Sequence, residues 1–137
     1  MAACDRADAL DRLKRAQEFL WVADMVLGER VETAEGDDAI NLSGVSAALS
    51  VLAGIAASDA ATCLRLGQRS RGQDHREALT LLRRIEPDGD GLAKDLDRLL
   101  GLKDNAHYGV LGVADSEARK ALEWAGRLTE TVRRLSR

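Results

Sequence analysis

Near the end of the chain, the stretch "LGLKDNAHYG" concentrates the side chains that could act as acids, bases or phosphate ligands. It holds Lys103, Asp104, Asn105, His107 and Tyr108, although the whole chain has only two histidines and one tyrosine. On a helix, residues four apart are neighbours, so Lys103 would face His107 and Asp104 would face Tyr108. A cation beside a histidine can support phosphodiester cleavage, because the histidine moves a proton while the cation stabilises developing negative charge. The simpler interpretation is the polar C-terminal end of a helix, which favours cations.

Asp59 and His75 are two further polar residues on otherwise apolar helical stripes. An ionised carboxylate inside a helical bundle is costly unless it is paired, so we expect Asp59 to pair with His75 or a nearby Arg. His75 opens an amphipathic segment preceded by Arg69 and Arg71. Guanidinium groups match phosphate oxygens, which makes Arg69, Arg71 and His75 candidate phosphate contacts. The alternative for both residues is a purely structural role.

Helices must position these residues, because the composition favours helix over sheet. Aromatic residues make up 3% of the chain and there is one proline, whereas sheets favour β-branched and aromatic residues. Hydrophobic residues are 45% and charged residues 31%, which is typical of a globular protein. At 137 residues, we expect a single all-α domain covering 1–137, built as an up-and-down bundle.

Periodicity and turn signals predict five helices, at about 5–27, 38–66, 73–85, 92–108 and from 115 to the end of the chain. The second is apolar on nearly all sides and rich in Ala, Gly and Ser, so it should lie at the centre. Residues 39–58 carry no charge, and a segment of this length could cross a membrane. Their serines and the flanking Asp38 and Asp59 favour a buried core helix instead, with no membrane contact.

Charge and cysteine content narrow the range of partners. The formal net charge of −3 argues against a generic polyanion binder, although basic helix faces still allow local contact with nucleic acid. Cys4 and Cys63 are too few for a disulfide framework, and Cys63 is predicted to be a small core residue. No metal site, cofactor motif or covalent nucleophile is indicated. The N-terminus has no signal peptide, so we expect a cytoplasmic protein.

The segments "AINLSGVSAALSVLAGIAASDAATCLRLG", "SRGQDHREALTLL" and "LLGLKDNAHYGV" together resemble the HEPN superfamily, over most of residues 5–135. That family comprises small all-α domains of four to five helices in prokaryotic toxin–antitoxin and defence systems. Active members resemble metal-independent ribonucleases, in which a dimer unites two motifs of Arg, four to six residues and His. This chain departs from the motif, since Lys103 and His107 have only three residues between them and Lys replaces Arg. Arg69 and His75 match the spacing, with five residues between them, but they straddle a loop before the third predicted helix.

Three functions follow from these observations. The first is a HEPN-like toxin or defence component acting on RNA, with Lys103 and His107 as catalytic residues. The second is a catalytically inactive HEPN-like module that binds a nucleotide, nucleic acid or a partner such as a nucleotidyltransferase antitoxin. The third is a structural helical bundle whose polar residues satisfy one another. In each case the resemblance and the apolar stripes predict a homodimer.

Overall fold

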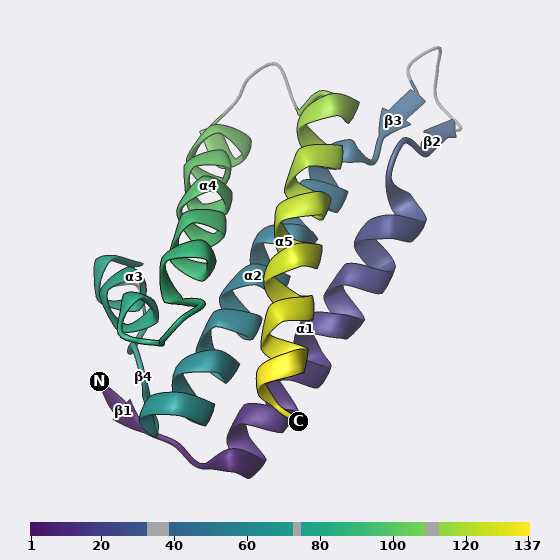
Figure 1. Ribbon diagram of the computed structural model, residues 1–137. Helices are drawn as coiled ribbons and strands as arrows, with labels where there is room; N and C mark the ends of the chain where they lie inside the picture. The colour runs from purple at the N-terminus through teal and green to yellow at the C-terminus, as the bar shows by residue number, and fades with distance from the viewer. Residues whose placement is uncertain (33–38, 73–74, 109–112) are drawn as a thin grey trace.

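The computed structural model describes residues 1–32, 39–72, 75–108 and 113–137, and describes the backbone alone at 32, 39–41 and 103–108. Its helices confirm the predicted all-α fold. In the described ranges these are α1 (Arg6–Val26), α2 (Ser43–Leu66), α3 (His75–Arg83), α4 (Gly89–Tyr108) and α5 (Asp115–Leu135). The four long helices run side by side, and the short α3 lies at one end of the bundle beside the start of α4 (Figure 1).

Local sequence explains where the first helix begins and ends. Asp5 caps α1, because its carboxylate accepts a hydrogen bond of 2.8 Å from the Asp8 backbone N–H. The Asp8 carboxylate in turn accepts one of 3.0 Å from the Asp5 backbone N–H. At the other end, Gly28 has a φ of +76°, which glycine adopts without steric cost. The observed helix therefore agrees with the range predicted at about 5–27.

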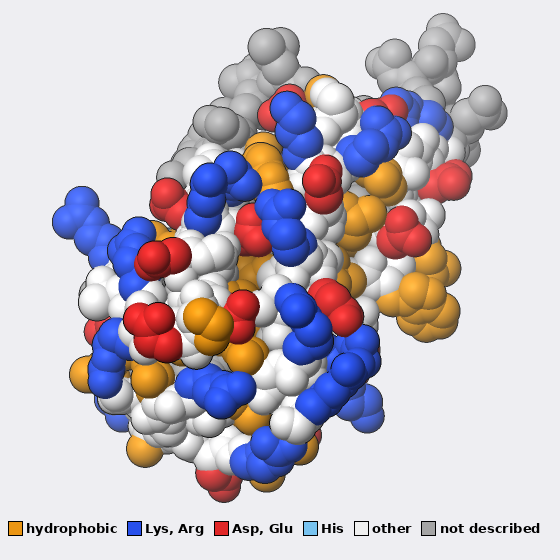
Figure 2. Space-filling model, in the orientation of Figure 1, with side chains coloured by type: hydrophobic (Ala, Val, Ile, Leu, Met, Phe, Trp, Pro, Cys, Tyr) orange, Lys and Arg blue, Asp and Glu red, His pale blue; other side chains and the backbone are white. Residues whose placement is uncertain are grey.

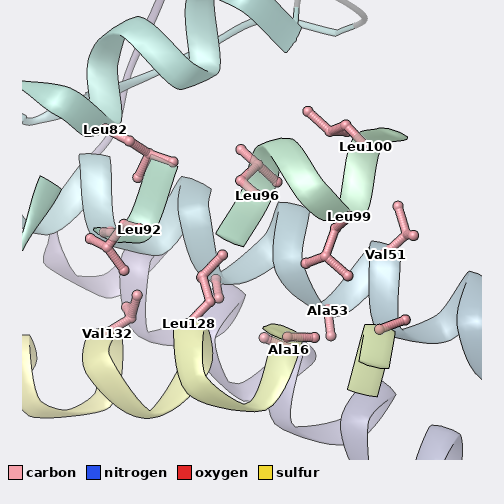
Figure 3. Packing of buried hydrophobic residues seen from close by; sticks show 14 of the residues in the cluster. Ala16, Val51, Ala53, Leu82, Leu92, Leu96, Leu99, Leu100, Leu128 and Val132 are labelled. Carbon is pink, nitrogen blue, oxygen red and sulfur yellow. The ribbon is translucent and has the colours of Figure 1, made fainter. Parts of the chain in front are cut away.

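α2 is the central helix, as its apolar sequence predicts, and packs against α1, α4 and α5. Leu96 and Leu99 of α4 and Leu128 of α5 point into this core (Figure 3). Gly54 of α2 permits a close approach, because a Cβ at that position would lie 2.5 Å from Cδ1 of the buried Leu99. α2 is long and apolar enough to cross a membrane by length and composition, yet 61% of its most apolar window is buried within the bundle.

Within the described ranges, two short two-stranded sheets accompany the helices, and neither was predicted. β1 (Ala2–Ala3) pairs antiparallel with β4 (Gln68–Arg69), and β2 (Arg30–Glu32) pairs antiparallel with β3 (Ala39–Asn41). The second pairing corrects the predicted start of the central helix. α2 begins at Ser43 rather than at residue 38, because the backbone of residues 39–41 forms strand β3 and pairs with β2 instead of continuing the helix. Residue 38, where this helix was predicted to start, lies outside the described residues.

The start of α5 is attached to the start of α2 by a polar cluster. Asp115 accepts hydrogen bonds from the Ser43 hydroxyl and from Arg30, whose Nη2 lies 3.1 Å away. The hydrogen bond from Ser43, followed by that from Arg30, lowers the pKa of the Asp115 carboxyl. Asp115 therefore joins three elements rather than only opening its own helix.

Candidate functional site

A small pocket lies where α2, β4, α3 and α4 meet. Its volume is about 210 Å³. It brings together Asp59, Arg69 and His75, three of the residues singled out in the sequence. The remaining lining residues are Ile55, Ser58, Ser70, Gly72, Ala78 and Leu96. The lining therefore combines polar and apolar side chains.

Helix geometry and two glycines place these side chains around one space. Ser58 and Asp59 follow Ile55 by three and four residues, so all three lie on one face of α2. Gly67 ends α2 with a left-handed backbone (φ 68°), and its N–H donates to the Cys63 carbonyl at 3.1 Å. Gly72 also has a positive φ of 60°. The chain can therefore fold back so that Arg69 and His75 lie over α2.

Asp59 is the acidic residue among those that line this pocket. Its side chain is 17% exposed, and burial raises the pKa of its carboxyl, while the charges of Arg12 and Arg69 act in the opposite direction. Arg12 Nη1 lies 3.6 Å from Asp59 Oδ2. The predicted ion pair is thus confirmed, but with an Arg of α1 that sequence reasoning missed. A signal was available, because Arg12 and Asp59 lie at similar distances from the connection between the antiparallel helices α1 and α2.

Ser58 and His75 supply hydrogen-bonding groups that the described residues leave unused. The Ser58 hydroxyl is buried, with the residue 2% exposed, and has no hydrogen-bond partner there. His75 is half-buried at the first residue of α3, and no hydrogen bond or ion pair to its ring is found within the described ranges. A buried hydroxyl without a partner costs free energy. The Ser58 hydroxyl and the His75 ring could therefore form hydrogen bonds with a bound ligand.

Arg69 has the position and freedom to contact a bound anion. It is half-buried in β4, and its Nη1 donates to the Ser70 carbonyl at 3.4 Å, a long hydrogen bond. Arg71, the other candidate phosphate contact, is exposed and does not line the pocket. Of the two Arg residues predicted to contact phosphate, Arg69 therefore lines the pocket and Arg71 does not.

The "KDNAHY" stretch is helical as far as Tyr108, which confirms that α4 continues through it. The side chains of Lys103, Asp104, Asn105, His107 and Tyr108 lie outside the described residues. Their pairings and their catalytic role therefore stay predictions. Among the side chains that are described, no group of His, Cys, Asp and Glu could hold a metal ion.

A second buried carboxylate, Asp95 of α4, makes much closer contacts than Asp59. Arg127 of α5 binds it with two hydrogen bonds, of 2.9 Å from Nε and 2.6 Å from Nη2. Arg98 Nη1 adds an ion pair at 3.7 Å, and its guanidinium lies 5.8 Å from the centre of the Trp124 ring. The bonds to Asp95 raise the pKa of Arg127. This cluster connects α4 to α5, and both oxygens of the Asp95 carboxylate accept hydrogen bonds from Arg127.

Cys63 is not the free core thiol that the sequence predicted. It forms a disulfide with Cys4, and the two Cα atoms lie 5.4 Å apart. The prediction was wrong because two cysteines 59 residues apart give no sign of proximity until the tertiary fold is known. Cys63 itself is 4% exposed, so the predicted burial is confirmed.

Comparison of the chain with protein-family models and with curated proteins gives no match. The class that the fold and pocket define is therefore an all-α bundle with a partly buried polar pocket. Membership of the HEPN superfamily stays a prediction.

Proposed function

We propose that this chain is a HEPN-like module that binds a phosphate-bearing ligand, either a free nucleotide or the phosphorylated end of an RNA. The observation that carries the proposal is the meeting of Arg69, His75 and the unpartnered Ser58 hydroxyl in one small pocket. An Arg fork, an imidazole and a hydroxyl are all groups that can hydrogen-bond phosphate oxygens.

Charge and size both favour a phosphate group over a larger organic ligand. Arg12 and Arg69 lie around the single acid Asp59, whose own ionisation is disfavoured by burial. The surroundings are therefore cationic at neutral pH or below. Sites for drug-sized molecules usually measure about 300–1,000 Å³, whereas this pocket measures about 210 Å³. It fits one anionic group, with the remainder of the ligand lying outside.

Calorimetric titration with adenosine 5′-monophosphate and with a 5′-phosphorylated RNA decamer tests this proposal. Arg69→Gln should weaken binding by about tenfold or more, the effect of losing a hydrogen bond between charged groups. Arg71→Gln is the matched control, because Arg71 is an exposed cation two residues away and should leave the affinity unchanged. The same decamer with a 5′-hydroxyl should bind weakly. Saturable binding of neither phosphorylated probe, or equal effects of the two Arg changes, would contradict the proposal.

RNA cleavage by Lys103 and His107 is a second candidate function. The observation in its favour is the continuous helix through Tyr108, whose backbone places these two residues one turn apart. A histidine that transfers protons contributes about 10²–10⁴ in rate, so His107→Ala should abolish any metal-independent cleavage by the wild type. The length of the RNA decamer after incubation with each protein provides the measurement, and an uncleaved wild-type sample would remove this candidate.

We further propose a cytoplasmic homodimer, with a cognate nucleotidyltransferase antitoxin as a candidate partner. Exposed apolar residues support self-association, since Trp21 is 72% and Met25 60% exposed on α1, and Val45 and Leu52 are exposed on α2. Orange side chains gather at the edge of the molecule formed by α1, whereas positive and negative charges alternate over α4 and α5 (Figure 2). Light scattering that gives only the 14.8 kDa monomer at micromolar concentrations would contradict the dimer.

A further inference from the structure

An N-terminal arm, residues 1–4, lies against the connector that carries Arg69 into the pocket. Within β1, Ala2 is opposite Arg69 and Ala3 is opposite Gln68. The Cys4 backbone N–H donates to the Gly67 carbonyl at 3.0 Å. The arm therefore pairs with residues 67–69 of the connector, which we define as residues 67–72.

The Cys4–Cys63 disulfide is the strongest bond between this arm and the rest of the fold. The sheet it accompanies has only two residues in each strand, and such a short isolated pair has little stability of its own in water. Cys63 lies one helical turn after Asp59, so the disulfide joins the arm to α2 close to the pocket. The covalent bond and the position of Arg69 are thus coupled through β1 and β4.

Besides the arm, the connector packs against α2 through β4, and Ser70 within it is buried. Gly67 and Gly72 lie at its two ends, and both have positive φ angles that only glycine adopts readily. Apart from the arm, the Arg69 side chain is held by its long bond to the adjacent Ser70 carbonyl and by the charge of Asp59. Cys63, by contrast, is buried within a continuous helix of the core. Opening the disulfide should therefore release the arm and connector and leave the bundle intact.

We propose that the Cys4–Cys63 disulfide is a redox-sensitive clasp that sets the affinity of the Asp59–Arg69–His75 pocket for its phosphate-bearing ligand. The inference rests on the proposed function for its ligand but not for the clasp itself. The arm lies on the element that carries Arg69, so closure fixes this cation over the pocket and opening lets it move away.

Opening requires two electrons and two protons, which a dithiol reductant supplies. A thiolate of the reductant attacks the sulfur of Cys4, because Cys4 is half-buried whereas Cys63 is 4% exposed. The S–S bond breaks, Cys63 leaves as a thiolate and takes up a proton, and a mixed disulfide forms at Cys4. The second thiol of the reductant then displaces Cys4, which also becomes a thiol, and the reductant is left as a disulfide. In a reducing cytoplasm the dithiol form is the resting state, and oxidation closes the clasp.

The test compares oxidised and dithiothreitol-treated wild-type protein, with Cys4→Ser as the matched variant that cannot close. Thiol labelling with mass spectrometry first counts free cysteines, and two free thiols in the air-oxidised protein would overturn the proposal. Reduction should weaken adenosine 5′-monophosphate binding by about tenfold, the effect of one lost hydrogen bond between charged groups. Cys4→Ser should show the weaker affinity with or without reductant.

Amide hydrogen exchange keeps the clasp testable if the ligand assignment fails. Reduction should speed exchange at residues 67–72, while exchange in the core of α2 and α5 stays slow. Absence of nucleotide binding in both redox states, with faster exchange on reduction, would remove the proposed function and retain the clasp. Unchanged exchange at residues 67–72 on reduction would overturn the clasp, whatever the binding result.

Discussion

Two carboxylates on neighbouring helices, Asp59 of α2 and Asp95 of α4, lie in the interior of the bundle with contrasting partners. Asp95 receives two short hydrogen bonds from Arg127 and an ion pair from Arg98. Asp59 has one ion pair at 3.6 Å, and burial raises its pKa. Both side chains are largely buried, since that of Asp95 is 7% exposed and that of Asp59 is 17% exposed. On burial each carboxylate loses its hydrogen bonds to water. The protein replaces them more completely at Asp95 than at Asp59.

Under the proposed function, this difference distinguishes a carboxylate that only connects helices from one that lies beside a bound ligand. A fully hydrogen-bonded carboxylate connects two helices and has nothing left to offer a ligand. Asp59 has one longer ion pair and lies beside the unpartnered Ser58 hydroxyl, so we expect it to contribute less to stability at neutral pH. The following predictions test this contrast, in order of decreasing effect on stability.

Asp95→Asn should give the largest loss of stability. The amide cannot accept two charge-assisted hydrogen bonds from Arg127, although it keeps the volume of the side chain. We expect the free energy of unfolding to fall by about 1.5 kcal/mol, the lower end of the range for bonds to charged groups, because Arg127 is 51% exposed and water partly replaces its partner. Urea denaturation at pH 7 measures the change. A midpoint equal to that of the wild type would mean that Asp95 is no better satisfied than Asp59.

Asp59→Asn should change the free energy of unfolding at pH 7 in the opposite direction from Asp95→Asn, and by a smaller amount. Because the folded pKa is raised above 3.8, the folded state binds the proton more tightly than the unfolded chain. The stability that Asp59 contributes is therefore complete below pH 3.8 and is lost as pH rises through the folded pKa. At pH 7 the Asn variant should be at least as stable as the wild type.

Denaturation of both proteins across pH 3 to 7 checks this sign. The free energy of unfolding of the wild type, relative to Asp59→Asn, should fall with rising pH and then become constant. A wild type that gains stability relative to the variant over that range would show that Arg12 satisfies Asp59 as well as Arg127 satisfies Asp95.

Glu130→Gln should have the smallest effect on stability, although the hydrogen bonds from Arg133 to Glu130 are nearly as short as those from Arg127 to Asp95. Arg133 Nη2 lies 2.8 Å from Glu130 Oε1, and the hydrogen bond from Arg133 lowers the pKa of Glu130. Both side chains are about half exposed, so water screens the pair and replaces it when it is lost. We expect an unchanged urea midpoint. A loss comparable to that of Asp95→Asn would show that distance, rather than burial, decides the contrast.

Much of the bundle follows from local features of the sequence. Periodic Leu and Ala residues predict the long helices, Asp5 and Gly28 mark the limits of α1, and the continuity of α4 through Tyr108 follows from its pattern. These features depend on residues within a turn or two of each other, whose spacing is fixed by the helix itself. The meeting of Arg69 and His75 was likewise suggested by their closeness in sequence.

Tertiary structure alone decided which distant residues meet. The partners of Asp59 and Asp95 come from other helices, and the chain offers 20 Lys and Arg residues from which pattern alone cannot choose. Cys4 and Cys63 are brought to a Cα separation of 5.4 Å by the path of the arm along β4. The sequence thus determined the helices and the kinds of polar group in the pocket, because helical spacing is local. Packing determined which carboxylate is satisfied and which cysteines are joined, because both depend on contacts across the whole fold.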